Sequence, residues 1–275
     1  MLSWLLSAAL AAGVPESGQI TCQTDHYTVA FSAEQAWTIY SIKHDGQNVG
    51  LSNGFYGTVM CPKGGQWWGT GHSEGGREVV NSLKLTVDGL ERPVKVGETI
   101  GGHRITLLKD STIWKFKCQA EVTLTDNQVY ERTQLEAMAD CEQSLMYYFM
   151  HAWLPTTTKW IAQLPDGKLE EGALLSDENM KVNKDTRWVA QFEPNLKLGI
   201  LCYTPKVISG PGSASLIWDK KHYHKSYYRS NEARSFKAGE KLDYSVVVKV
   251  AADETGDWVA TKAAAEALAK SYPPE

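Results

Sequence analysis

The segment Leu242-Asp243-Tyr244-Ser245-Val246-Val247-Val248-Lys249-Val250 decides the fold class, because apolar or aromatic side chains recur at every second residue. This alternation is typical of a β-strand with one buried face. Shorter segments of the same kind precede it, at residues 27–31, 38–42, 83–87, 105–108, 113–118, 122–124, 188–192, 198–203 and 215–218. We therefore predict a domain built from many short strands, and not from alternating strands and helices.

Turn residues separate these segments and indicate antiparallel hairpins. His44-Asp45-Gly46 and Asp88-Gly89 each follow an alternating run, which is a hairpin signal. Residues 145–150 are apolar on both faces, which predicts a strand in the middle of its sheet. Near the C-terminus the period becomes that of a helix capped by Asp257, with a stripe formed by Trp258, Thr261, Ala265, Leu268 and Tyr272. The predicted fold is all-β: a large antiparallel two-sheet sandwich with a C-terminal helix packed on its outside.

The composition of the 275 residues favours a sugar ligand over a nucleic acid. Asp and Glu (32) outnumber Lys and Arg (28), whereas phosphate binding needs a basic excess. Ten Trp and twelve Tyr stand beside six Phe. Indole and phenol rings offer an apolar face and a polar edge, which suits stacking against a pyranose. We predict a carbohydrate ligand, no nucleic-acid partner, no cofactor and no metal; the oligomeric state is not predicted.

The first twelve residues contain an apolar run in which Ala9-Leu10-Ala11 can serve as a cleavage site. We predict a signal peptide over 1–12, a single domain over 13–275 and a secreted or periplasmic location; an ordinary apolar N-terminal strand is the alternative. The run is too short to cross a bilayer, and no later segment predicts a membrane span. Five widely spaced cysteines form no C-x-x-C pair, so a structural zinc site is not predicted. Because their number is odd, at least one thiol is free, and one or two disulfides are possible.

The glycine-rich segment 64–78 is the first candidate functional region. Trp67 or Trp68 can form a platform for a sugar, and Arg77 adds a binding charge. His72 and Glu74 can act as proton donor and acceptor. The alternative is a plain connection with its Trp side chains packed inward. Residues 71–75 also match the G-x-S-x-G nucleophile motif, but the strand–turn–helix context that this motif requires is missing.

A second candidate region spans Trp218 to Arg229, where cations interleave with aromatic residues. In an extended chain, His224 and Tyr228 share one face, while Lys225 and Arg229 share the other. Such cations suit an acidic sugar, and His or Tyr can abstract or return a proton beside a uronate. A metal bound by His222 and His224 is less favoured, because no third ligand is evident. A solvated strand with core aromatics is the alternative.

A third candidate is His151, which ends the apolar strand in Phe149-Met150-His151-Ala152-Trp153. Sites open at the ends of central strands, so we predict a catalytic role for His151 and a binding role for Trp153. A hydrogen-bonded core histidine is the alternative.

These three features together resemble the galactose mutarotase-like family. The resemblance rests on the glycine-rich loop with His72, the strand ending in His151-Ala152-Trp153-Leu154, and Ala238-Gly239-Glu240 before the last strand. It implies a β-supersandwich in which two histidines, here His72 and His151, contact the sugar. It also implies a carboxylate base, for which the candidates are Glu74, Asp219 and Glu232. Mutarotases usually have Asn before the second histidine, where this chain has Met150.

The functional hypothesis is a secreted carbohydrate-active protein with His/Glu/Tyr acid–base chemistry, either epimerase-like or polysaccharide lyase-like. The alternative is a non-catalytic glycan-binding or structural sandwich. The first hypothesis predicts that the four acid–base side chains surround one concave surface with Trp67 or Trp68 at its rim. Those side chains are His72, Glu74, His151 and His224.

Overall fold

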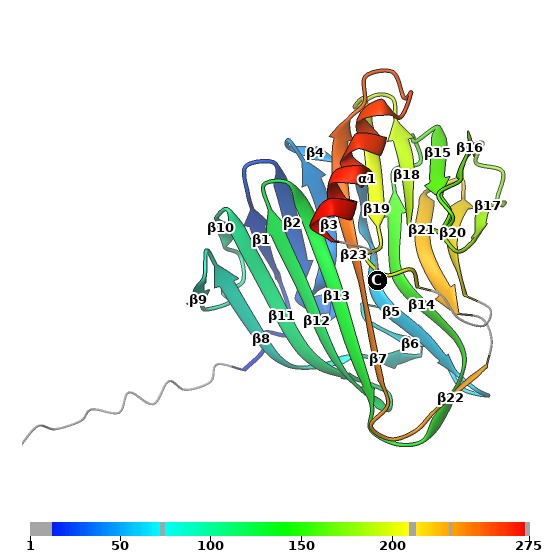
Figure 1. Cartoon of the computed structure of the whole chain (residues 1–275). Helices are drawn as coiled ribbons and strands as arrows, with labels where there is room; N and C mark the ends of the chain where they lie inside the picture. The colour runs from blue at the N-terminus through cyan, green and yellow to red at the C-terminus, as the bar shows by residue number, and fades with distance from the viewer. Residues whose placement is uncertain (1–12, 72–74, 209–212, 231–232, 273–275) are drawn as a thin grey trace, which may run out of the picture.

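The computed structural model describes residues 13–71, 75–208, 213–230 and 233–272, and it consists of three sheets and one α-helix (Figure 1). The five-stranded sheet has the order β10 (Thr99–Gly101), β1 (Gln19–Gln23), β2 (Tyr27–Ser32), β3 (Thr38–His44) and β4 (Gln47–Asn48), with a 3-10 turn η1 (Ala33–Gln35) after β2. The described pairings are antiparallel except β1 with β10 and β6 with β7.

The two larger sheets form the sandwich. The ten-stranded sheet has the order β16 (Leu169–Ala173), β15 (Lys159–Gln163), β18 (Trp188–Glu193), β19 (Leu198–Tyr203), β23 (Lys241–Ala252), β13 (Gln128–Ala137), β12 (Phe116–Thr125), β11 (Arg104–Ile113), β8 (Val79–Val87) and β9 (Leu90–Arg92). The eight-stranded sheet has the order β17 (Met180–Lys184), β20 (Ser213–Asp219), β21 (His224–Ser230), β14 (Cys141–Trp153), β5 (Gly50–Pro62), β6 (Trp68–Gly69) and β7 (Gly76–Arg77), with β22 (Arg234–Phe236) paired to β14.

The core between these sheets confirms the alternation that predicted them. Tyr244, Val246, Val248 and Val250 of β23 are all buried in it. The Tyr244 ring lies 4.4 Å from that of Tyr148 and 5.2 Å from that of Phe149 in β14. β14 lies between β5 and β21, so the predicted central position of residues 145–150 is also confirmed.

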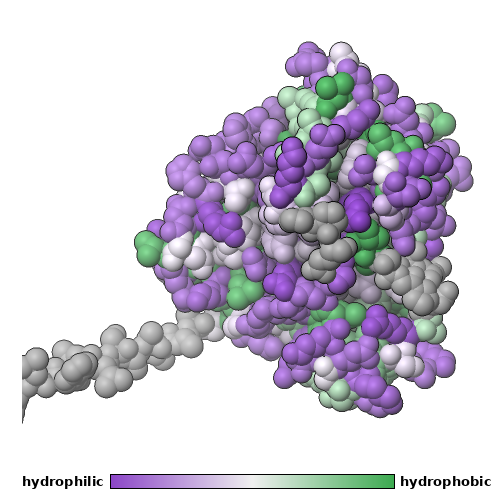
Figure 2. Space-filling model, in the orientation of Figure 1, coloured by the Kyte–Doolittle hydropathy of each residue, from purple (hydrophilic) through white to green (hydrophobic). Residues whose placement is uncertain are grey.

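The helix α1 (Val259–Ser271) packs on the outer face of the ten-stranded sheet, over β19 and β23 (Figure 1). Ala265 and Leu268 bury against Leu201 and Val247. The Asp257 carboxylate accepts a hydrogen bond from the Val259 N–H at 3.0 Å, but the N-cap residue is Trp258, so Asp257 lies one position before the cap. Figure 2 shows that this side of the molecule is mostly hydrophilic.

Two local features differ from the predicted strands. Residues 113–118 are not one strand, because β11 ends at Ile113 and β12 begins at Phe116, with Trp114 in a left-handed turn conformation (φ 50°). β14 contains a bulge between Tyr148 and His151, where Phe149 has φ 44°. Tyr148 and Phe149 therefore both face the core, and the bulge reverses which later residues point inward.

All five cysteines are free thiols, so the disulfides considered from the sequence are not formed. No helix in the described ranges is long and apolar enough to cross a membrane. The segment 1–12 lies outside the described residues, so the signal peptide and export stay predictions.

Candidate functional site

The outer face of the eight-stranded sheet carries a set of aromatic side chains that we call the aromatic face. It comprises Tyr56 of β5, Trp67 before β6, Tyr147 of β14, Trp218 of β20, Tyr223 before β21 and Tyr227 of β21. Because side chains alternate across a strand, Lys225, Tyr227 and Arg229 point outward while their neighbours point into the core.

The rings of the aromatic face pack on one another. The rings of Trp67 and Tyr147 are stacked, with centroids 5.5 Å apart and planes 2° apart. Tyr147 meets Tyr227 edge to face at 5.2 Å. Met150 and Trp218 pack against the same cluster. Burial raises the pKa of Tyr147 and of Tyr227, so both phenols are neutral hydrogen-bonding groups at physiological pH.

Cations lie among these rings. The Lys225 ammonium lies 5.6 Å from the ring centroid of Tyr56 and 5.1 Å from that of Tyr223. Arg229 pairs in register with Tyr147 across β21 and β14. Its Nη2 donates to the neutral Asn183 Oδ1 at 3.1 Å, and its buried Nε has no hydrogen-bond partner among the described residues.

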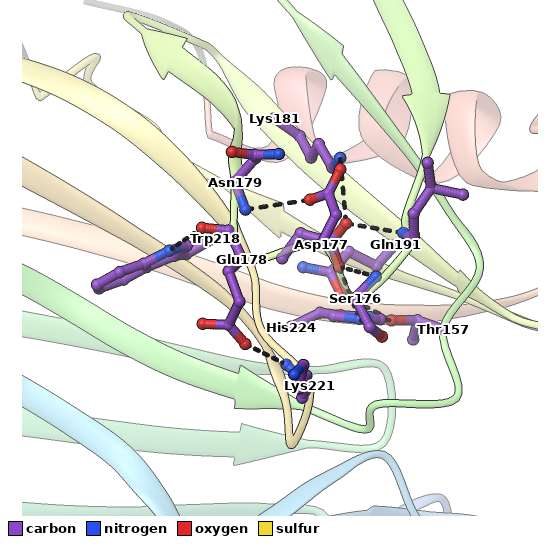
Figure 3. Close-up of polar contacts among 12 residues, drawn as sticks. Thr157, Ser176, Asp177, Glu178, Asn179, Lys181, Gln191, Trp218, Lys221 and His224 are labelled. Atoms are coloured by element: carbon purple, nitrogen blue, oxygen red, sulfur yellow. Dashed lines mark hydrogen bonds and ion pairs between the residues drawn. The ribbon is translucent and has the colours of Figure 1, made fainter.

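The segment from Leu175 to Lys181 forms the rim of the aromatic face at Trp218 (Figure 3). Trp218 Nε1 donates to the Glu178 carbonyl oxygen at 3.2 Å, and the Glu178 carboxylate accepts the Lys221 N–H at 3.0 Å. The same carboxylate pairs with Lys220, whose ammonium lies 4.1 Å from the Trp218 ring centroid. These contacts fix the position of Trp218.

The buried Asp219 carboxylate holds this rim from below. It accepts the N–H groups of Leu175 at 2.7 Å and Ser176 at 2.9 Å. It also lies 3.0 Å from His224 Nε2 and 3.2 Å from Lys181 Nζ. Four donors converge on one carboxylate that is inaccessible to solvent. Asp219 is therefore a structural anchor in this fold and is not exposed to a ligand.

His224 continues this network into the core (Figure 3). Its Nδ1 lies 2.6 Å from Thr157 Oγ1, which also contacts Gln191 Oε1 at 3.0 Å. Since Asp219 accepts at Nε2, that nitrogen carries a hydrogen. Burial lowers the pKa of His224, while the negative charge of Asp219 opposes that shift. The imidazole is therefore neutral at pH 7.

Two of the histidines predicted to be catalytic, His151 and His224, are buried and, within the described residues, line no surface cavity. His151 is 1% exposed, with Nε2 2.9 Å from Glu131 Oε1 and Nδ1 3.8 Å from Cys202 Sγ. His224 is buried as described above, so the expected meeting of His151 and His224 at the surface is wrong. The β14 bulge turns His151 inward, and hairpin pairing turns His224 inward. The metal alternative also fails, because His222 is exposed while both His224 nitrogens already have partners.

Other predicted site residues divide between the core and the surface. Trp153 is fully buried and donates from Nε1 to Ser226 Oγ at 3.2 Å, so it does not meet a ligand. Tyr228 is buried, and its hydroxyl has no partner in the described ranges. Lys225 and Arg229 lie on the aromatic face, on the opposite side of the sheet from Tyr228.

The glycine-rich segment brings one of its two Trp residues to the aromatic face. Trp67 stacks on Tyr147, whereas Trp68 packs against the core and over Gly76. Arg77 is exposed and lines a separate cavity of about 280 Å³ beside Trp37. His72, Glu74 and Glu232 lie outside the described residues.

Sequence reasoning missed Tyr56 and Tyr147 as surface groups. Tyr147 was assigned to a strand covered on both sides, yet it is half-buried. The signal that could have revealed this surface was the alternation of Tyr223, Lys225, Tyr227 and Arg229. It indicates that these side chains share the outer face of β21, which pairs with the strand that carries Tyr147.

The sequence matches no protein-family model and no curated protein. Among solved structures, the GH36 α-galactosidase AgaB from Geobacillus stearothermophilus aligns over 88% of this chain and 41% of its own, with a TM-score of 0.52 and 10% identity. A putative aldose 1-epimerase from Escherichia coli K12 aligns over 84% and 98%, with a TM-score of 0.45 and 10% identity. A galactose mutarotase related enzyme from Lactobacillus acidophilus aligns over 86% and 98%, with a TM-score of 0.46 and 10% identity.

The chain has the fold of the matching part of the GH36 α-galactosidase, and it is similar to the two mutarotase-related structures. The resemblance stated from the sequence is confirmed at the level of the fold. The chain corresponds to about two fifths of the α-galactosidase. At 10% identity these similarities concern the fold alone, so any activity has to be argued from this chain's own residues.

Proposed function

We propose that the protein binds an acidic glycan on the aromatic face. The observation that carries the proposal is the half-buried stack of Trp67 on Tyr147, with Tyr227 packed against its edge. The half-buried rings of Trp67 and Tyr147 present apolar surface to the C–H face of a sugar while their polar edges hydrogen-bond, and the buried Tyr227 supports them.

The charges beside the rings favour an acidic sugar over a neutral one. Arg229 lies next to Tyr147, and its described hydrogen bond goes to a neutral amide and not to a carboxylate. A guanidinium can bind a uronate carboxylate through two hydrogen bonds. Lys220 contributes less, because Glu178 already neutralises it.

The test is calorimetric titration of the protein with uronate-containing and neutral oligosaccharides. Trp67→Ala and Tyr147→Ala should each weaken binding about tenfold, equivalent to about 1.4 kcal/mol. Arg229→Gln should weaken binding of the acidic glycan and leave a neutral one nearly unchanged. The matched control is Trp114→Ala, which removes a half-buried Trp with its own stacked Lys115 from the turn between β11 and β12. Unchanged affinity in both aromatic variants would contradict the proposal.

Catalysis is a separate question, because the burial of His151 and His224 supports binding better than acid–base turnover. His72 and Glu74 lie outside the described residues, so epimerase-like and lyase-like activity stay predictions. Both activities can be assayed with the same samples. An epimerase speeds the change of optical rotation, and a lyase generates the absorbance of an unsaturated uronide.

A further inference from the structure

Two turns of the five-stranded sheet bring histidines together. His26 lies in the turn between β1 and β2, and His44 and Asp45 lie at the turn between β3 and β4. Asp45 and Gly46 both have positive φ (47° and 78°), as a two-residue hairpin turn requires. The Asp45 N–H donates to the His26 carbonyl oxygen at 2.9 Å, so the backbone itself joins the two turns.

The side chains of this cluster converge on one carboxylate. Asp45 Oδ1 lies 2.8 Å from His26 Nδ1, and Asp45 Oδ2 lies 3.4 Å from His44 Nδ1. One potential ligand atom from each residue lies within 4.8 Å of the others. The edge of the buried Tyr27 ring packs against His44 at 5.0 Å and holds it in place.

The cluster is open to solvent on one side. The side chains of His26 and Asp45 are 56% and 59% exposed, whereas that of His44 is 15% exposed. An ion can therefore approach from solvent while His44 supplies a fixed ligand. The turns contribute two imidazoles and one carboxylate, which are ligand types that suit zinc and similar divalent transition metals.

We propose that His26, His44 and Asp45 bind a divalent metal ion of the zinc class. Ligand atoms around a tetrahedral zinc ion lie roughly 3.4 Å apart, given bond lengths of about 2.0–2.1 Å. The observed separations of 2.8 and 3.4 Å need only small side-chain rotations to reach that geometry. Three protein ligands leave a fourth position for water or an incoming ligand.

The charged groups around the cluster favour a cation. Asp25 and Asp126 both act electrostatically on His26, and they add negative charge beside the proposed ligands. Lys249 of β23 acts in the opposite direction on His44. Asp25 and Asp126 also form a neighbouring group with His103. That group has one imidazole, so we assign the ion to the two-histidine cluster.

The test uses the full chain, stripped of metal by a chelator and titrated calorimetrically with Zn²⁺ alone. The wild-type protein should bind one ion at this cluster. His26→Gln and His44→Gln should each weaken that binding by about 10–100-fold or more, because losing a direct ligand costs at least as much as losing one of its supporting groups. The control His222→Gln, an exposed histidine between β20 and β21, should bind as the wild type does.

A second measurement separates metal binding from misfolding. Zn²⁺ joins the two turns only in the folded chain, so it should raise the Tm of the wild type and of His222→Gln, but not that of His26→Gln. His26 is exposed, so its substitution leaves the core intact. The proposal is overturned if the wild type binds no Zn²⁺, if both cluster variants bind it normally, or if His103→Gln abolishes binding instead. These outcomes are independent of glycan binding.

Discussion

Replacing Asp219 with alanine should lower the free energy of unfolding by about 3–5 kcal/mol. The carboxylate is fully buried and accepts the N–H groups of Leu175 and Ser176. Hydrogen bonds to a charged group contribute about 1.5–3 kcal/mol each. Two such bonds account for about 3–5 kcal/mol, and the neutral His224 would also lose its partner at Nε2. Lys181 adds little, because it keeps its 2.5 Å contact with Asp177.

Urea unfolding at pH 7, followed by circular dichroism, measures this loss. The matched control is Asp177→Ala, which removes a more exposed carboxylate from the same segment and should cost less than about 1 kcal/mol. The urea m-value should not change, because the folded core is retained. A loss below about 1 kcal/mol for Asp219→Ala would show that the network does not hold the segment.

Two further predictions concern buried charge. Because burial lowers the pKa of His224 below 6.5, the unfolded chain binds that proton more readily, and stability is lost as the pH falls below about 6.5. The drop in urea midpoint between pH 7 and pH 5 should therefore be smaller in His224→Gln; equal drops in the two proteins would refute this. Lys109 Nζ lies 2.9 Å from Glu78 Oε2, with both side chains buried, so Lys109→Met should cost about 3–5 kcal/mol by leaving Glu78 unpaired. The double variant Lys109→Met/Glu78→Gln should recover part of that loss in urea unfolding. An unchanged urea midpoint in Lys109→Met alone would contradict the reasoning.

Period-two patterns predicted the sheet content well but failed wherever the chain changes phase. Within residues 224–229 the two faces are as predicted: His224 and Tyr228 point inward, while Lys225 and Arg229 point outward. Continuing one extended strand back to Trp218 gave the wrong partners. The chain forms a hairpin there, and register pairs Trp218 with Lys225 and Asp219 with His224.

The prediction for the position of His151 failed for a related reason. Strict alternation placed it with Leu145 and Tyr147, but the bulge at Phe149 inserts one residue and reverses the phase. Phenylalanine rarely adopts a positive φ, so nothing local in the sequence marks this bulge. It forms because both Tyr148 and Phe149 find space against Tyr244 in the opposite sheet, which is a tertiary effect.

The position of β23 has a consequence for how the chain folds during synthesis. Among the described strands it comes last in the sequence, yet it lies between β19 and β13 in the ten-stranded sheet. Strands β8, β9, β11, β12 and β13 form one group and β15, β16, β18 and β19 another, and each group can pair with near neighbours as it leaves the ribosome. The two groups stay unconnected until residues 241–252 arrive. Until then β13 and β19 each have an unpaired edge that can recruit other chains. The contacts of β13 with β23 link residues more than a hundred positions apart, and such long-range pairing slows closure of the sheet and prolongs the exposure of these edges.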